Sequence, residues 1–223
     1  MSVSVSPPGA SMMDHGISAQ LEAWPFRPGE SPFRVKGGTF LAHQSYVEAN
    51  VPGGQGAQAH ALRPASRAFF EDGFLRSSSY DIAPLIEAGL VCGRLTGTSF
   101  QEFVHARSAA QVETDVSGVY RFIAKLATPS GAALRMARGF ALYFDFIEAT
   151  VHRRGSARLE VELEGMPELL VYPWFQAVFP GYAEGLARFV RAPRVDARLE
   201  RLERTGQIEG VDVVRTRLVI DYG

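Results

Sequence analysis

The sequence predicts an α+β fold, in which a helical N-terminal half packs with a C-terminal antiparallel sheet of about four strands and a long helix. Apolar residues recur at helical spacing before residue 150 and then alternate with charged residues over 157–163. An aromatic-rich helical segment at 169–191 separates this strand from two more, at 194–204 and 211–222. Hydrophobic residues make up 46% of the 223-residue chain and charged residues 21%, which is ordinary for one folded domain.

Residues 1–32 differ in composition from the rest of the chain. They begin with a stretch rich in serine and proline, and further prolines follow. Such a stretch buries little apolar surface, so we expect 1–32 to be a disordered tail and 33–223 to be a single domain. Trp24 and Phe26 are exceptions within the tail. This aromatic pair docks either on the domain's own core, which is the plainer interpretation, or on a partner.

Glycines and prolines divide the N-terminal half into several helices. The first is expected over 40–50 and the second over 57–72, where Pro64 should kink or shorten it. The third begins near residue 78 and ends at Gly93, a residue type that commonly follows a helix.

Two start signals mark the helices that follow. Ser99 and Glu102 are spaced as a capping box, in which each side chain bonds the other residue's backbone. Thr128 and Pro129 have the pattern of an N-cap followed by proline in the first turn, and the helix they open is expected to run to about 150. Its apolar stripe comprises Phe140, Phe144, Ile147 and Val151.

The last two strands rest on a choice between alternatives. Every residue of the sequence ARLERLER, within 194–204, also favours helix. We prefer a strand because the alternating segment 157–163 needs partners to form a sheet. The segment 205–210 is then the hairpin that connects the two strands.

Charge and cysteine content exclude several classes of protein. The net charge of −1 leaves no electrostatic footprint for nucleic acid. The single cysteine, Cys92, excludes an intrachain disulfide and a multi-cysteine zinc site. No signal peptide and no apolar run long enough to span a membrane is visible, so we expect a cytoplasmic protein.

Three loose motifs carry a family resemblance over about residues 33–222. They are VKGGTF at 35–40, the proline-initiated long helix and the terminal TRLVIDY at 216–222. On these motifs the chain resembles a paralogous family of myxobacterial proteins of unknown function. More distantly it resembles the superfamily of haem–nitric-oxide-binding, four-vinyl-reductase and TRAPP domains. The resemblance implies helices packed on a four-stranded sheet, binding of a small molecule or a partner, often as a dimer, and no catalysis.

The haem-binding branch of that superfamily uses one proximal histidine on a helix. His105, in FQEFVHARSA, is the best-placed of the five histidines for this role. The Tyr-x-Ser-x-Arg signature that this branch uses for the haem propionates is absent from the sequence. A histidine at the surface or at the edge of the core is the ordinary alternative.

No motif specifies a reaction or a metal. The chain lacks the HExxH, GxSxG, Walker and GxGxxG patterns, and the cysteine cluster that holds zinc in the four-vinyl-reductase branch is missing. We therefore predict no catalytic residue and no metal ligand.

Aromatic residues are the most suggestive feature of the sequence. They lie on more than one face of two predicted helices, which exceeds what a single core contact requires. One face lines a cavity or a dimer interface, unless all of them form one large core. The candidate ligand-binding residues are Phe140, Tyr143, Phe144, Trp174, Phe175, Phe179 and Tyr182.

These observations favour a non-enzymatic sensory or adaptor domain. We expect it to bind a hydrophobic small molecule or a protein partner at the aromatic helices, as a homodimer, with no cofactor. A haem-based gas sensor that uses His105 is the first alternative. An enzyme of unrecognised type is the second.

Overall fold

The computed structural model describes residues 12–115, 131, 139, 142–153, 157–191 and 194–222. Within these residues it contains the helices α1 (Met12–Ala23), α2 (Gly37–Asn50), α3 (Gly54–Ala61), α4 (Pro64–Glu71), α5 (Ala83–Thr96), α6 (Phe100–Asp115) and α9 (Val171–Val190). Its strands are β1 (Arg34–Lys36), β2 (Ser79–Asp81), β3 (Glu148–Arg153), β4 (Arg158–Pro167), β5 (Val195–Ile208) and β6 (Val211–Tyr222). No helix of this described part is long and apolar enough to cross a membrane.

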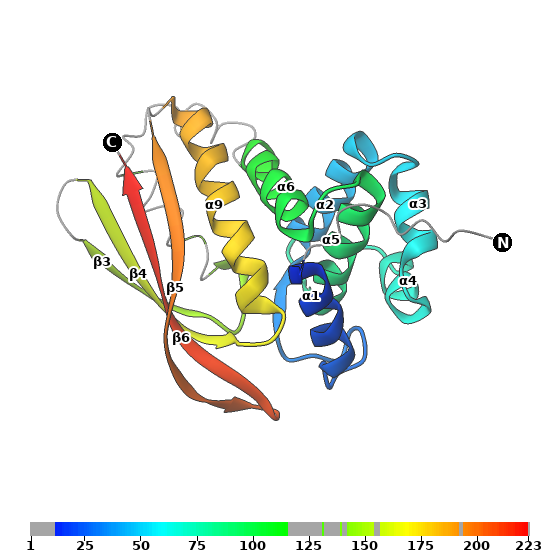
Figure 1. Cartoon of the computed structure of the whole chain (residues 1–223), viewed down its shortest axis with the longest axis horizontal. Coiled ribbons are helices and arrows are strands. Elements are labelled where there is room, and N and C mark those ends of the chain that lie inside the picture. The colour runs from blue at the N-terminus through cyan, green and yellow to red at the C-terminus, as the bar shows by residue number, and fades with distance from the viewer. Residues whose placement is uncertain are drawn as a thin grey trace.

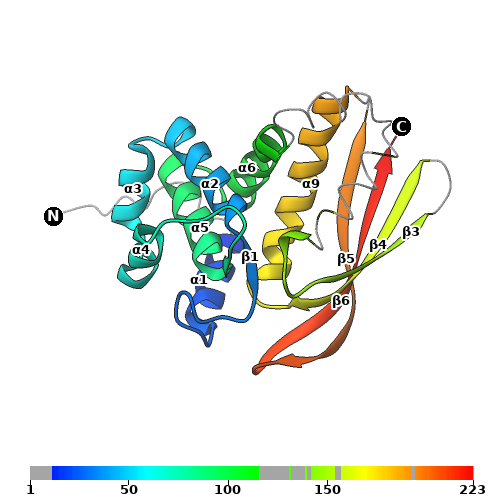
Figure 2. The same cartoon turned by 180° about the vertical axis from the view of Figure 1, so that it is seen from behind.

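The elements form layers, as Figure 1 shows. Helix α9 lies between the larger sheet and α6, and the other N-terminal helices gather on the far side of α6. The reverse view in Figure 2 places the short strand β1 beside this helical group. The predicted α+β class, with a helical N-terminal half and a C-terminal antiparallel sheet, is confirmed.

The larger sheet has the strand order β3-β4-β6-β5, and all its pairs are antiparallel. Leu159, Val161 and Leu163 of β4 are buried, whereas the charged residues between them are half-buried, as the alternation predicted. The strand preferred for 194–204 is also confirmed, as β5. The expected hairpin at 205–210 is too long, because β5 continues to Ile208.

The helix predicted from Pro129 to about 150 is wrong at its C-terminal end. Helical structure stops at Tyr143, Phe144 forms an isolated bridge with Val35, and residues 148–153 form strand β3. The apolar residues at 147, 149 and 151 alternate with polar neighbours, so the same residues that suggested a helical stripe also fit a strand. Phe140 lies outside the described residues.

The expected disordered tail is wrong for residues 12–32. Helix α1 forms within it, and Ile17 and Leu21 are buried in the core. The Trp24 ring lies 5.6 Å from that of Phe26 and 5.7 Å from that of Phe33, so the aromatic pair docks on the chain's own core.

The helices before residue 100 differ from expectation in their ends. The helix predicted over 57–72 is two helices, because Pro64 begins α4 rather than bending a continuous helix. Helix α5 starts later than predicted, at Ala83, whose N–H donates to the Asp81 carboxylate at 3.0 Å. It also continues past Gly93 to Thr96, and Gly97, with φ of 70°, takes the left-handed backbone that ends it.

The capping box that begins α6 is confirmed. The Glu102 carboxylate accepts hydrogen bonds from the Ser99 N–H at 2.8 Å and from its Oγ at 2.7 Å. In return, the Glu102 N–H donates to Ser99 Oγ at 3.2 Å. This reciprocal pair fixes the start of α6, the helix that carries Arg107, Gln111 and Asp115.

Candidate functional site

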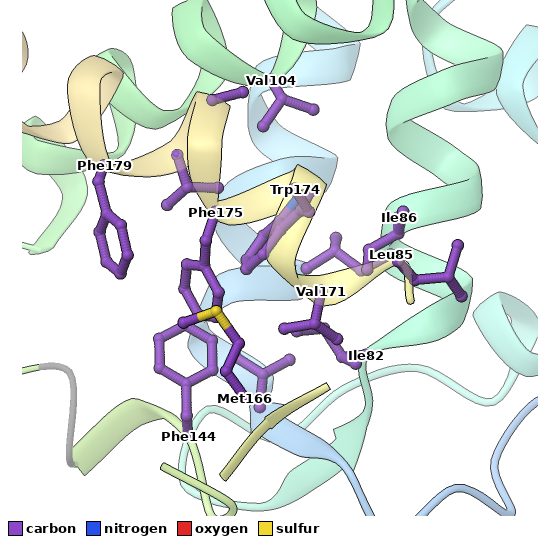
Figure 3. Packing of buried hydrophobic residues seen from close by; sticks show 14 of the residues in the cluster. Ile82, Leu85, Ile86, Val104, Phe144, Met166, Val171, Trp174, Phe175 and Phe179 are labelled. Carbon is purple, nitrogen blue, oxygen red and sulfur yellow. The ribbon is translucent and has the colours of Figure 1, made fainter. Parts of the chain in front are cut away.

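Four of the predicted aromatic residues form one cluster in the core, which Figure 3 shows. The Phe175 ring stacks on that of Phe179 with centroids 4.6 Å apart, and it lies 4.8 Å from the Phe144 ring and 5.0 Å from that of Trp174. All four side chains are buried. Burial of each ring contributes about 1.5–3 kcal/mol to folding, so this aromatic cluster is a major stabilising element and an apolar wall.

Two glycines hold α9 against α6. A Cβ added to Gly181 would overlap the carbonyl oxygen of His105, and one added to Gly185 would overlap that of Ala109. Because these positions are four residues apart on both helices, they lie on one face of each. The two backbones are therefore in direct contact, and Tyr182, which follows the first glycine, is fixed at the crossing.

A polar network runs along α6 beside this crossing. Its residues Arg107, Gln111 and Asp115 are spaced four apart and share one face of the helix. Arg107 Nη1 donates to Gln111 Oε1 at 2.9 Å, and Gln111 Nε2 donates to Asp115 Oδ2 at 3.3 Å. The amide of Gln111 thus links the guanidinium to the carboxylate without a direct ion pair.

Two predicted tyrosines meet at the end of this network. The Tyr182 hydroxyl donates to Asp115 Oδ2 at 3.2 Å, and the Tyr143 hydroxyl also bonds this carboxylate. Burial raises the pKa of Asp115 above its usual range, although these hydrogen bonds oppose the shift. Burial and the nearby Asp115 raise the pKa of both tyrosines, so their hydroxyls stay protonated and remain donors.

Arg107 is a buried charge with little compensation. Its side chain is 2% exposed, and its described hydrogen bonds go to the neutral oxygens of Gln111 and Ser108. Burial lowers its pKa to about 10, so it is still charged at neutral pH. Its Cζ lies 5.9 Å from the Trp174 ring centre, an attraction of about 2 kcal/mol when desolvated. Desolvating a cation costs several kcal/mol, so the ring alone does not offset it.

His43, on α2, is the second buried polar group that faces this region. Its Nε2 lies 3.3 Å from Gln58 Oε1, and its Nδ1 has no hydrogen-bond partner among the described residues. Burial, with a smaller contribution from the charge of Arg107, lowers the pKa of His43 to about 3. The imidazole is therefore neutral at physiological pH. One turn earlier on α2, the Thr39 hydroxyl is likewise buried without a described partner.

His105 does not fit the role of a haem ligand. Its side chain is 37% exposed and its Nε2 lies 3.4 Å from a carboxylate oxygen of Glu184. A proximal histidine needs an apolar pocket on its ligating side. Beside His105 the backbones of α6 and α9 are in contact, since the His105 carbonyl lies against Gly181.

The described residues hold neither a metal site nor an activated thiol. No group of three or more His, Cys, Asp or Glu side chains that could bind a metal occurs among them. Burial raises the pKa of Cys92 to about 12, so this thiol is unreactive at neutral pH.

A hollow of about 430 Å³ lies away from the aromatic cluster. The loop after α1 lines one side of it, with Trp24 and Phe26, and the first turns of α4 and α5 line the other. Most of the predicted helix 129–150 lies outside the described residues, so a cavity between it and the helix predicted at 169–191 stays a prediction.

Sequence reasoning missed Arg107, Asp115 and His43. A signal for the first two exists, because RSAAQVETD at 107–115 places Arg107, Gln111 and Asp115 at i, i+4 and i+8, on one face of the helix. Such a stripe is usually exposed, and only the packing of α2 and α9 reveals that it is buried.

Comparisons with known proteins identify a shared fold. No protein-family model and no curated protein sequence matches the chain. Among solved structures it is similar to a protein described for modulation of haem redox potential through protein-induced porphyrin distortion. That match has a TM-score of 0.52 and 13% identity, and it covers 84% of this chain and 99% of that one. The chain is similar also to a Cs H-NOX mutant carrying 4-cyano-L-phenylalanine, with a TM-score of 0.50, 13% identity, and 84% and 96% coverage. At such identity the likeness shows the fold alone.

Proposed function

We propose that the chain is a non-enzymatic sensory domain that binds a small, largely apolar molecule beside the polar network of α6. One observation carries the proposal: the hydroxyls of Tyr143 and Tyr182, from two separate elements, converge on the buried carboxylate of Asp115. Small-molecule sites combine an apolar wall with a few convergent polar groups. Here the aromatic cluster supplies the wall and the network supplies the polar groups.

The shared fold supports the sensory part of the proposal. The structures similar to this chain include H-NOX proteins, and one of them is described for its haem. In this chain the network occupies the junction between the N-terminal helices and the sheet layer, so a ligand bound there would contact both parts. We propose in addition that the domain is a homodimer.

Native mass spectrometry of the purified protein tests this proposal. We expect part of the sample to carry a co-purified small molecule, and the spectrum also reports the dimer. Tyr182→Phe removes one hydroxyl and keeps the ring, so it should lower the ligand-bound fraction without unfolding the protein. As a matched control, Tyr172→Phe changes a half-buried tyrosine of α9 that does not contact Asp115 in the described residues. A ligand-free monomer would overturn both the ligand and the dimer.

Haem binding is the second candidate, and the fold favours it. Since His105 does not fit, the remaining buried imidazole among the described residues is that of His43. A haem bound to this chain would supply an iron atom for a gas ligand. Titration with haemin followed by absorption spectroscopy tests this candidate: a Soret band that is unchanged in His105→Ala and lost in His43→Ala supports it. No shift of the free haemin spectrum would exclude it.

A further inference from the structure

We infer that the ligand of this domain is a monocarboxylate, or carries one carboxylate group, and that Arg107 binds that group. The inference rests on the proposed function and names the chemical class of its ligand. It follows from the hydrogen bonds of Arg107, from the groups around it, and from a comparison with the buried carboxylates of Glu87 and Asp81.

The hydrogen-bonding capacity of Arg107 is only partly used. A guanidinium offers five N–H donors in a planar fork that matches a carboxylate. Two bonds to described residues are present, to Gln111 Oε1 and to Ser108 Oγ, and both acceptors are neutral. No described carboxylate oxygen lies within 4.0 Å of it, which is unusual for a charge that is 2% exposed.

Two other buried charges among the described residues each accept three hydrogen bonds. The carboxylate of Glu87 accepts from the Arg63 backbone N–H at 3.1 Å, from Arg63 Nη2 at 2.7 Å and from Ser66 Oγ at 2.6 Å. The carboxylate of Asp81 accepts from three backbone N–H groups, at 2.9 to 3.4 Å. Each of these carboxylates therefore has more hydrogen bonds than the guanidinium of Arg107, which has two among the described residues.

The groups that face Arg107 suit an anion with a single charge. Tyr46 and His43 of α2 face Arg107, and the Nδ1 of the neutral His43 ring has no described hydrogen-bond partner. The Trp174 ring of α9 also faces Arg107. On α6 itself, Asp115 already contributes one negative charge to the network. A second charge, as on a phosphate dianion, would be repelled by Asp115, whereas one carboxylate complements one guanidinium.

Trp174 provides the readout for a direct test. The chain has two tryptophans, so Trp24→Phe leaves Trp174, which lies against Arg107, as the only indole. In this variant, fluorescence is titrated with acetate and benzoate, and with the neutral isosteres acetamide and benzamide. We expect a saturable change with at least one carboxylate, and affinity at least tenfold higher than for its amide.

Two further variants assign the effect to the site. Arg107→Gln in the same background should abolish the response to carboxylate. Arg198→Gln removes a half-exposed arginine of the sheet and should leave the response unchanged. If Arg107→Gln does not fold, the difference in affinity between carboxylate and amide in the Trp24→Phe protein is by itself the test of the inference.

The outcomes separate this inference from the proposed function. Equal or absent responses to all four probes overturn the inference. If native mass spectrometry nevertheless finds a co-purified neutral molecule, the proposed function stands with a different ligand class. A sample without any ligand that also ignores the carboxylates overturns both.

Discussion

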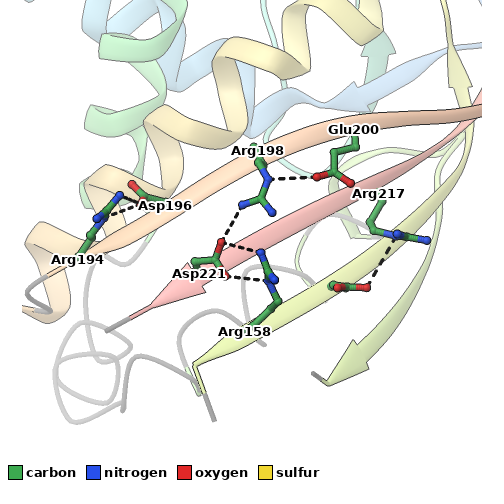
Figure 4. A network of polar contacts seen from close by, with 8 residues as sticks. Arg158, Arg194, Asp196, Arg198, Glu200, Arg217 and Asp221 are labelled. Carbon is green, nitrogen blue, oxygen red and sulfur yellow. Dashed lines mark hydrogen bonds and ion pairs between the residues drawn. The ribbon is translucent and has the colours of Figure 1, made fainter. Parts of the chain in front are cut away.

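Arginines occur in two contrasting settings in this molecule. On the outer face of the sheet, Arg158 and Arg198 both pair with Asp221 (Figure 4). The distances are 2.9 and 2.8 Å, and all three side chains are about 40–50% exposed. Between α2, α6 and α9, Arg107 is buried and has no described carboxylate partner within ion-pair distance. The pairs on the sheet are numerous, yet each is worth only about 0–1 kcal/mol.

The two settings differ in whether water solvates the charge, and this difference indicates which arginines are candidates for a binding site. Water solvates the arginines of the sheet, so their ion pairs are easily formed and easily lost. Arg107 is buried at the α6–α9 junction, so its incompletely compensated charge is a substantial cost that the fold retains. The dense charge pattern on the sheet therefore marks a solvated surface, whereas a single buried guanidinium marks a site.

The largest expected change in stability comes from removing the Trp174 ring, which lies beside Arg107. Trp174→Ala removes a buried side chain from the centre of the aromatic cluster and should lower the free energy of unfolding by about 3–5 kcal/mol. Leu142→Ala is the control, because that side chain is 73% exposed and its loss should change stability by less than about 0.5 kcal/mol. Urea denaturation measures both. A loss below about 1 kcal/mol for Trp174→Ala would show that the cluster is not packed as described.

The contact between α6 and α9 is expected to tolerate no side chain. Gly185→Ala should lower the free energy of unfolding by about 1–3 kcal/mol, because the added methyl group meets the Ala109 carbonyl. Gly56→Ala, on α3, meets no atom within 4 Å and should stabilise the protein by up to about 1 kcal/mol. Thermal unfolding of the two variants should move in opposite directions. A parallel shift would contradict the close approach of the helices.

Burial of His43 makes stability depend on pH. Its pKa is about 3 in the folded protein and 6.5 in the unfolded chain, so the unfolded chain binds the proton more tightly. The contribution of His43 is therefore complete above pH 6.5 and is lost as the pH falls toward 3. Between pH 7 and pH 5 we expect a loss of about 2 kcal/mol from this group. The loss should disappear in His43→Gln and persist in His60→Gln, an exposed control; an identical pH profile in all three proteins would refute the burial.

The smallest expected change in stability comes from removing an ion-pairing carboxylate on the sheet. Asp221→Asn removes the common partner of Arg158 and Arg198 and should cost no more than about 1 kcal/mol. In 1 M salt the screening length falls to about 3 Å, so the difference from the parent should shrink further. Guanidinium chloride would mask this effect, so urea is the denaturant of choice. A loss above about 2 kcal/mol, insensitive to salt, would remove the distinction between the two settings.

Local patterns predicted much of the fold and part of the site. The capping box of Ser99 and Glu102 and the alternation in β4 were read correctly, because each reports on the backbone of its own segment. The end of the helix predicted over 129–150 was wrong, since the same apolar residues fit both a helical stripe and a strand. Residues 148–153 form a strand because they pair with β4, and the sequence of 148–153 alone does not reveal this pairing.

His105 and Arg107 show why the candidate site was only partly predicted. They are two residues apart on α6, yet one faces solvent and Glu184 whereas the other faces the core. Sequence spacing gives the angle between two side chains on a helix, about 200° here, but not the rotation of the helix against its neighbours. That rotation is fixed by the packing of α2 and α9 on α6.

The most direct measurement is on the side chain of Arg107 itself. In protein labelled with ¹⁵N-arginine, the buried Nε–H of Arg107 should give a slowly exchanging signal, identified by its absence in Arg107→Lys. We predict that a carboxylate, acetate or benzoate, shifts this signal to a saturating end point and that the matching amide does not. A signal that stays in place with all four compounds would contradict the claim that Arg107 is held for an anionic ligand.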